Sequence, residues 1–470
     1  MDHRESVDAG NNYDLAVIGA GSAGFSAAIT AADQGAQVAL IGHGTIGGTC
    51  VNFGCVPSKT MIRAAETLHQ SKSAARFEGI KSNAQIDNWQ ALISQKDALV
   101  SSLRHAKYIN VLPEYNGVAY IEGQARFIKD KLTVNGRGIE ASKVILATGA
   151  TSSIPAISGI DQVPYLTSTT ALELGTLPRS LLVIGGGYIG CELAQMFARS
   201  GVEVTIVCRN RLIPEMEPEI SEALTGYFRD EGITVRPGLI YRNIKALDGR
   251  VLLDVGEGVI EAENVLLTTG RRPNTDDLGL IEAGIDVSKN GGIVVDDRLR
   301  TSKAGVYAAG DVTGRDQFVY MAAYGAKVAA LNAMNGDSLK YDSTVMPAVV
   351  FTDPQVASVG FTEAHARAAG IDVKTSVLSL EHVPRALAAR DTRGLIKLVA
   401  DKQTDKLLGA HILAPEGADS IQTAAIAIKA GFTTTDLAGT IFPYLTTVEG
   451  LKLAAQTFDK DVSKLSCCAG

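Results

Sequence analysis

The sequence predicts an α/β protein with two Rossmann-like dinucleotide-binding domains and a C-terminal α+β domain. Two segments, which start at Tyr13 and Leu181, run from a short apolar stretch through GxGxxG into an Ala-rich or apolar helical stretch. A lone GxGxxG is weak evidence, but the motif between a strand and a helix is typical of a dinucleotide site. Glycine accounts for 48 of 470 residues, about 10% against roughly 7% in average proteins, which fits tight strand-to-helix turns.

Composition and charge exclude several classes of protein. Hydrophobic residues make up 46% of the chain and charged residues 20%, which fits a globular rather than a disordered protein. The formal net charge is −7 and Lys and Arg form no block, so no nucleic-acid partner is expected. No apolar run reaches the ~18 residues of a membrane span, and the polar leader 1–12 lacks the features of a secretory signal. We therefore expect a cytoplasmic protein without a membrane partner.

The first motif comprises an apolar run, three glycines, a helix and a second strand: 13–18, Gly19, Gly21, Gly24, 25–32 and 37–41. The first glycine makes the turn, the second admits a pyrophosphate, and the third lets the helix and strand pack closely. The helix N-terminus adds partial positive charge beside the phosphates. In such units an acidic residue about 20 positions further on binds the ribose hydroxyls. Here that position is Gly42, followed by His43, so backbone groups or His43 are left to hold the ribose.

The second motif repeats this order of segments: 181–184, Gly185, Gly187, Gly190, 191–198 and 202–207. Cys208 stands where the acidic residue would be, and Arg209 and Arg211 follow it. The missing carboxylate and the two guanidinium groups favour a ribose 2′-phosphate, and hence NADPH over NADH. Gly190 counts weakly against this prediction, because Ala is common at that place in NADP-type sites.

Further strands and turns predict the division of the chain. Segments 144–150 and 265–274 are matching strand-to-turn segments, and a third buried strand starts at Val306 and leads to Asp311. After Tyr341 the pattern changes to alternating strands followed by helices. The predicted parts are a leader at 1–12, a first nucleotide-binding domain at 13–150 completed by 271–340, a second at 151–270, and a C-terminal domain at 341–470.

Two cysteines follow the first βαβ unit closely, in the segment GGTCVNFGCVPSK from Gly47 to Lys59. A regular helix would separate Cys50 and Cys55 by about 7.5 Å along its axis, whereas a disulfide needs Cα atoms within about 7 Å. A bridge therefore requires irregular backbone, which Gly54 permits. A helix N-terminus and Lys59 would lower a thiol pKa. Six cysteines in 470 residues are too few for a disulfide framework, so this pair predicts catalysis or metal binding.

The chain resembles the flavoprotein pyridine nucleotide-disulfide reductases over nearly its whole length, and GGTCVNFGCVPSK matches their redox-active motif. The resemblance implies a glutathione-reductase-like fold with FAD in the first nucleotide-binding domain, NADPH in the second, and a dimerisation domain. Cys50 would be the interchange thiol and Cys55 the thiolate against the flavin. Lys59 and Glu192 would form an ion pair beside the flavin, which Tyr188 would cover. The other residues implied at the cofactors are the glycines of both motifs, Gly48, Thr49, Thr148, Gly149 and Asp311 for FAD, and Arg209, Arg211 and Gly270 for NADPH.

The C-terminal segments indicate what the electrons reduce. Family members that act on disulfides carry a His-Pro near the C-terminus, where the His serves as acid and base. Here Phe442 precedes Pro443, and Phe cannot move a proton. The chain ends with Cys467-Cys468-Ala-Gly, and thiolates of this kind select soft metal ions.

Phe442-Pro-Tyr444-Leu-Thr and the Cys-Cys-Ala-Gly end closely resemble the branch of the family that reduces mercuric ion. This resemblance implies reduction of Hg(II) to Hg(0), for mercury detoxification, with Hg(II)–thiol complexes as substrate and a chain of thiol pairs that passes the ion inward. It also implies a homodimer in which Tyr444, Cys467 and Cys468 come from the other subunit. Tyr108 resembles a second active-site tyrosine. Many relatives carry an additional N-terminal metal-binding domain, so the short leader predicts the catalytic core alone.

Two alternatives remain open. A dihydrolipoamide-type disulfide reductase has the same fold, but Phe442 and the double-Cys end count against it. A protein that only stores Hg(II) or Zn(II) would need neither nucleotide fold. Cys191 and Cys208 are expected to be small buried residues without a chemical role.

Overall fold

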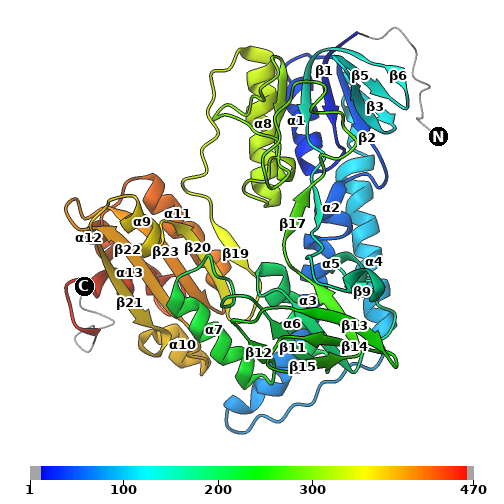
Figure 1. Ribbon diagram of the computed structural model, residues 1–470. Helices are drawn as coiled ribbons and strands as arrows, with labels where there is room; N and C mark the ends of the chain where they lie inside the picture. Colours follow the sequence, from blue (N-terminus) through cyan, green and yellow to red (C-terminus); the bar gives the residue numbers. More distant parts are fainter. Residues whose placement is uncertain (1–11, 463–470) are drawn as a thin grey trace. The chain divides into compact units, whose positions relative to one another are not determined.

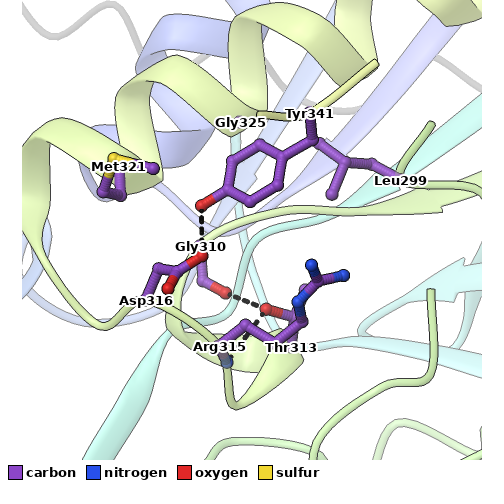
Figure 2. Close-up of a pocket in the computed structure, with 8 residues that line it drawn as sticks. All are labelled: Leu299, Gly310, Thr313, Arg315, Asp316, Met321, Gly325 and Tyr341. Carbon is purple, nitrogen blue, oxygen red and sulfur yellow. Dashed lines mark hydrogen bonds between the residues drawn. The ribbon is translucent and has the colours of Figure 1, made fainter. Parts of the chain in front are cut away.

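The computed structural model describes residues 12–462, which form two compact units (Figure 1). Within the described residues, the first unit contains 12–60, 91–153 and 270–343, and the second contains 61–90, 154–269 and 344–462. The helices α3 (Cys55–Lys72) and α4 (Trp89–Arg104) each begin in one unit and end in the other. The predicted domain bounds remain predictions, since the contacts group the second nucleotide-binding segment with the C-terminal segment.

The first unit is built on a parallel sheet with the strand order β18-β7-β1-β2-β3. β1 (Asn12–Ile18) pairs with β2 (Val38–Gly42) on one side and with β7 (Glu140–Leu146) on the other. This is the strand order of a doubly wound nucleotide-binding fold. The helices α1 (Ser22–Ala32) and α8 (Val319–Asn335) pack on each other and on buried strand residues such as Leu15 and Leu40.

The remaining elements of this unit are two outer strands of the sheet, two small antiparallel sheets and one short helix. They are β3 (Val118–Glu122), β18 (Val306–Ala308), β4 (Ala125–Ile128), β5 (Lys131–Val134), β6 (Arg137–Gly138), β8 (Ala150–Ser152), β17 (Arg271–Pro273) and α2 (Gly48–Asn52).

The second unit contains a second parallel sheet, in the order β12-β11-β10-β16-β9. β10 (Ser180–Ile184) leads into α6 (Tyr188–Arg199), and then β11 (Glu203–Val207) pairs with β10 in parallel. The other elements of this part are β9 (Tyr165–Leu166), α5 (Ser168–Ala171), α7 (Pro218–Asp230), β12 (Thr234–Arg236), β13 (Asn243–Leu247), β14 (Arg250–Asp254), β15 (Val259–Ala262) and β16 (Asn264–Leu267).

The C-terminal segment of the second unit folds around an antiparallel sheet in the order β19-β20-β23-β22-β21. Buried residues of its strands, such as Ile396 and Ile412, pack with Ile421 and Leu451 of the helices. Its elements are β19 (Ala348–Val350), β20 (Gln355–Gly360), α9 (Glu363–Ala368), β21 (Val373–Ser379), α10 (Pro384–Ala389), β22 (Leu395–Asp401), β23 (Leu407–Ala414), α11 (Gly417–Lys429), α12 (Thr434–Gly439) and α13 (Glu449–Gln456).

The predicted fold class is confirmed. Each GxGxxG segment joins a strand of a parallel sheet to a helix, and the C-terminal segment forms a separate α+β part with its own antiparallel sheet. The details differ at the ends of elements. The first helix begins at Ser22 rather than at residue 25, and the strand that starts at Val306 ends at Ala308, before Asp311. Across the described range 12–462, no helix combines the length and apolar character that a bilayer span demands.

Candidate active site

The two cysteines of the redox motif meet at a break between two helices. Cys50 lies in α2, Cys55 is the first residue of α3, and both residues are half-buried. The amides of Phe53 and Gly54 both donate to the carbonyl of Thr49, at 2.9 and 2.7 Å, so the chain turns sharply here. A Cβ at Gly54 would lie 3.2 Å from that carbonyl oxygen. The structure thus has the irregular backbone that a bridge between the two thiols requires.

The two thiols contact each other directly through a hydrogen bond. The hydrogen bond with Cys55, followed by burial, raises the pKa of the Cys50 thiol well above its ordinary value. Lys59 and the Cys55 backbone amide act in the opposite direction but are outweighed. The predicted effect of Lys59 is present in direction, but at Cys50 the contact between the thiols outweighs it, so the pKa of this thiol is raised in the dithiol form. The reason is that a second thiol in contact opposes a second negative charge.

A buried amide holds the redox loop in place. The Asn52 side chain donates from Nδ2 to the carbonyls of Ile46 (2.9 Å) and Gly48 (2.8 Å). Arg104, at the end of α4, donates from Nη1 to Asn52 Oδ1 at 3.1 Å. Neither Asn52 nor Arg104 was predicted from the sequence. The available signal was a polar residue between the two cysteines of an otherwise apolar and Gly-rich loop.

Tyr108 lies beside both the redox loop and the first glycine motif. It sits in a π-helical turn, His105–Ile109, directly after α4. Its ring packs edge-on against Phe25, with centroids 4.8 Å apart, and its hydroxyl lies 3.2 Å from Ser22 Oγ. Burial raises the pKa of Tyr108, and charge on Cys50 or Cys55 would raise it further, so the phenol stays protonated near the thiol pair.

The first glycine motif forms a cradle with the redox loop. The Cα atoms of Gly21 and Gly48 approach so closely that a Cβ on Gly48 would lie 2.6 Å from Gly21 Cα. A Cβ on Gly24 would lie 1.7 Å from the carbonyl oxygen of Gly19. Gly21 precedes α1, whose first turn has no acidic residue and no side-chain cap. The helix N-terminus is thus left open to an anion such as a pyrophosphate, so these residues fit FAD.

The other predicted FAD residues surround the ends of β7 and β18. Thr148 donates from Oγ1 to the carbonyl of Asn274 at 2.7 Å, and Gly149 has φ +71°. Asp311 opens a 3₁₀ turn after β18, with Arg271 Nε 3.6 Å from its Oδ2. Burial raises the pKa of Asp311, although Arg271 opposes this effect. Arg271 was not predicted from the sequence.

The second glycine motif forms a matching cradle that fits NADPH. Gly187 precedes α6 without a side-chain cap, and a Cβ on Gly190 would lie 2.1 Å from the carbonyl oxygen of Gly185. Tyr188 is the first residue of α6, and burial, aided by Glu215, raises its pKa. Gly270, predicted for NADPH, belongs to the first unit by its contacts, where its carbonyl accepts a hydrogen bond from Ser153.

The two arginines after β11 have different surroundings. Arg211 donates from Nη2 to the carbonyls of Pro214 (3.0 Å) and Met216 (2.7 Å), so it braces its own loop. Arg209 is exposed and lies over the Tyr241 ring, 5.8 Å from its centroid. Cys208 is buried beside Gly186, as expected of a small apolar residue.

The remaining predicted residues lie in separate parts of the chain. Lys59 belongs to the first unit, whereas Glu192 belongs to the second and accepts a hydrogen bond at Oε1 from the amide of Phe351 at 2.9 Å. Their ion pair therefore stays a prediction. Tyr444 lies between α12 and α13 and is 55% exposed, while Phe442 packs partly against the C-terminal core. Cys467 and Cys468 lie outside the described residues.

The amino-acid sequence matches a known protein family. The family model described as pyridine nucleotide-disulphide oxidoreductase matches residues 13–330, and the model of its dimerisation domain matches residues 346–455. A mercuric reductase from Lysinibacillus sphaericus is 49% identical over 466 residues, which cover 98% of this chain and 85% of the relative. A mercuric reductase from Streptomyces lividans is 48% identical over 475 residues, which cover 99% of this chain and 100% of the relative.

A solved structure agrees with these matches. The Cu(II) complex of RclA, a HOCl-induced flavoprotein disulfide reductase from Escherichia coli, is similar with a TM-score of 0.85 and 31% identity. The match covers 95% of this chain and 99% of that chain. The chain belongs to the pyridine nucleotide-disulphide oxidoreductases and, within them, to the mercuric reductases.

Proposed function

We propose that this chain reduces Hg(II) to Hg(0) at the Cys50–Cys55 pair, with electrons from NADPH that pass through FAD. The observation that carries the proposal is a pair of thiols in contact with each other, beside Tyr108 and the glycine cradle of the first motif. Hg(II) is a soft ion, and soft ions select thiolate ligands.

FAD and NADPH are the cofactors of the family, and both cradles fit them. Gly19, Gly21, Gly24 and Gly48 would hold the FAD pyrophosphate, with Thr49, Thr148, Gly149 and Asp311 around the rest of the cofactor. Gly185, Gly187 and Gly190 would do the same for NADPH. When bound, the two cofactors supply the two electrons that Hg(II) needs.

The thiol pair also determines how the metal is bound. Thiolates, not thiols, bind metal ions, so Hg(II) that binds both sulfur atoms must displace two protons, one from Cys50 and one from Cys55. Lys59 favours the charged form of Cys50 and so helps this exchange. Asn52 and Arg104 brace the backbone of the loop that carries Cys50.

Delivery of the ion belongs to the same proposal. Cys467 and Cys468 of the partner subunit would take Hg(II) from a small thiol and pass it to Cys50 and Cys55 by ligand exchange. Tyr444 of the partner subunit would lie along the path that Hg(II) takes between the two cysteine pairs. The dimerisation domain supports a homodimer, and the exposure of Tyr444 in one chain fits a residue that serves a second subunit.

Substitution of Arg209 tests whether the second nucleotide site prefers NADPH to NADH. Arg209 is the exposed arginine at the end of β11, whereas Arg211 is engaged by two carbonyls. A hydrogen bond to a charged group contributes about 1.5–3 kcal/mol, so Arg209→Ala should raise the KM for NADPH by roughly tenfold or more. The KM for NADH should not change. An equal effect on both nucleotides would show that Arg209 does not read the 2′-phosphate.

The proposed activity is tested by a comparison of substrates. Purified protein with FAD is given NADPH together with Hg(II) in excess small thiol, with lipoamide, or with glutathione disulfide. Of these three substrates, only the Hg(II)–thiol mixture should give rapid NADPH oxidation, because Phe442 occupies the position at which a disulfide reductase needs a side chain that can transfer a proton. Oxidation that requires a disulfide would contradict the proposal and favour a dihydrolipoamide-type reductase.

A further inference from the structure

The first nucleotide site lacks the residue that normally binds the adenosine ribose. In dinucleotide-binding folds an acidic side chain at the end of the second strand holds the ribose hydroxyls. Here β2 ends at Gly42, which is buried and has no side chain. Its carbonyl accepts a hydrogen bond from the Gly123 amide at 2.8 Å, so its backbone oxygen is already engaged.

A tyrosine from the neighbouring strand fills this position. Tyr120 lies on β3, opposite Leu40 in the parallel register with β2. A Cβ built on Gly42 would lie 2.6 Å from the Tyr120 hydroxyl oxygen and 2.9 Å from its ring carbon Cε2. The same point lies 2.8 Å from the Cβ of Ala20, a residue of the glycine motif itself. Tyr120 thus takes the space that a carboxylate at position 42 would need, beside the nucleotide cradle.

The chemistry of the phenol suits a ribose. Burial, followed by the charge of Glu122, raises the pKa of Tyr120, so the hydroxyl stays protonated and can donate as well as accept. Within residues 12–462, no protein group forms a hydrogen bond with this hydroxyl. A ribose diol needs a neighbour with both capacities. His43, the other polar side chain at this end of β2, is exposed.

We propose that the Tyr120 hydroxyl binds the ribose of the adenosine half of FAD, in place of the missing carboxylate at Gly42. The proposal rests on FAD as the cofactor of the first cradle and concerns only how this chain holds it. The Tyr120 side chain leaves no room for a Cβ at position 42, and its hydroxyl supplies the polar contact to the ribose.

The test is a binding titration of the apoprotein with FAD and with FMN, which lacks the adenosine half. Tyr120→Phe removes only the hydroxyl, so the fold and the packing around Gly42 are kept. One hydrogen bond is worth about 0.5–1.5 kcal/mol net, so the FAD dissociation constant should rise by roughly threefold to tenfold. FMN binding should not change. The matched controls are Tyr115→Phe, a phenol just before β3, and His43→Ala, and both should bind FAD as the wild type does.

The outcomes separate the possible roles of Tyr120. Unchanged FAD affinity in Tyr120→Phe would overturn the proposal, as would an equal loss for FAD and FMN, which would indicate a packing role. A loss in His43→Ala with none in Tyr120→Phe would assign the ribose to His43. Neither mercury nor NADPH enters this titration, so its result is independent of the proposed reduction of Hg(II).

Discussion

At the scale of single residues, the chemistry of the site depends on one contact that primary structure does not show. Cys50 and Cys55 are five positions apart, and the pKa of Cys50 depends on whether their sulfur atoms touch. The sequence predicted the effect of Lys59 correctly in direction. The sequence could not predict that the hydrogen bond between the thiols would outweigh the effect of Lys59. That bond exists only because the helix is interrupted at Phe53 and Gly54.

This contact has a measurable consequence in the reduced protein. Replacing Cys55 by Ala removes both the hydrogen bond and the repulsive charge, so the pKa of Cys50 should fall. A raised pKa means less thiolate at a given pH, so iodoacetamide should modify Cys50 at lower pH in Cys55→Ala than in the wild type. Peptide mapping by mass spectrometry follows the modification. Cys191→Ala, which removes a buried thiol of the second unit, should keep the wild-type profile. Identical profiles in the wild type and Cys55→Ala would refute the contact.

At the scale of elements, the sequence predicted the two strand–turn–helix units well because their function fixes their pattern. Local glycine spacing sets the turns at Gly19 and Gly185, and each is followed by a helix as expected. The π-helical turn that presents Tyr108 could not be predicted, since it depends on packing against Phe25 and Ser22. The pairing of Tyr120 with Gly42 is equally hidden, because about 80 residues separate β2 from β3 in the chain.

Elements of the second unit are joined by a buried ion cluster. Lys397 on β22 contacts Glu217 (3.0 Å) and Glu219 (2.8 Å) at the start of α7, and Glu363 (3.0 Å) on α9. The side chains of Lys397 and Glu217 are each 2% exposed. Removing one partner of a buried pair costs about 3–5 kcal/mol, because the other charge stays buried. Lys397→Met should therefore lower the free energy of unfolding by that amount, measured by denaturant titration.

The pH dependence of this loss has a defined sign. Lys397 lowers the pKa of Glu363, and it outweighs partial burial to lower that of Glu219. Carboxylates with lowered pKa values stabilise the fold above their unfolded pKa of about 4.3 and lose this contribution as the pH falls. The difference between the wild type and Lys397→Met should thus shrink in acid. Lys402→Met, which breaks an exposed pair with Asp372, should cost at most about 1 kcal/mol. Similar losses in both variants would contradict the role of the buried cluster.

At the scale of the whole molecule, the proposed mechanism requires two subunits. In that proposal Tyr444, Cys467 and Cys468 of the partner subunit complete the active site, and the match to the dimerisation domain supports the homodimer that this needs. The sequence carries this prediction only through its resemblance to a family, because nothing in the spacing of Cys50 and Cys467 tells which chain supplies each residue.

Mixed dimers test the sharing of the site. One variant carries Cys50→Ala, and the other carries Cys467→Ala with Cys468→Ala. Each homodimer should be nearly inactive with Hg(II) bound to a bulky dithiol. Dissociating and remixing the two variants should restore activity, since a mixed dimer contains one site with an intact inner pair and an intact partner tail. Activity that stays absent after remixing, although mixed dimers form, would show that the tail serves its own subunit.

The most direct test of the account is the amount of mercury vapour released for each NADPH consumed. Purified protein with FAD is supplied with Hg(II) in excess small thiol, and the headspace is trapped and assayed while NADPH absorbance is followed. Two electrons per NADPH and two per Hg(II) predict one Hg(0) for each NADPH in the wild type, and no vapour above background in Cys50→Ala or Cys55→Ala. NADPH consumption without vapour, or vapour that persists in both variants, would contradict the reduction of Hg(II) at this thiol pair.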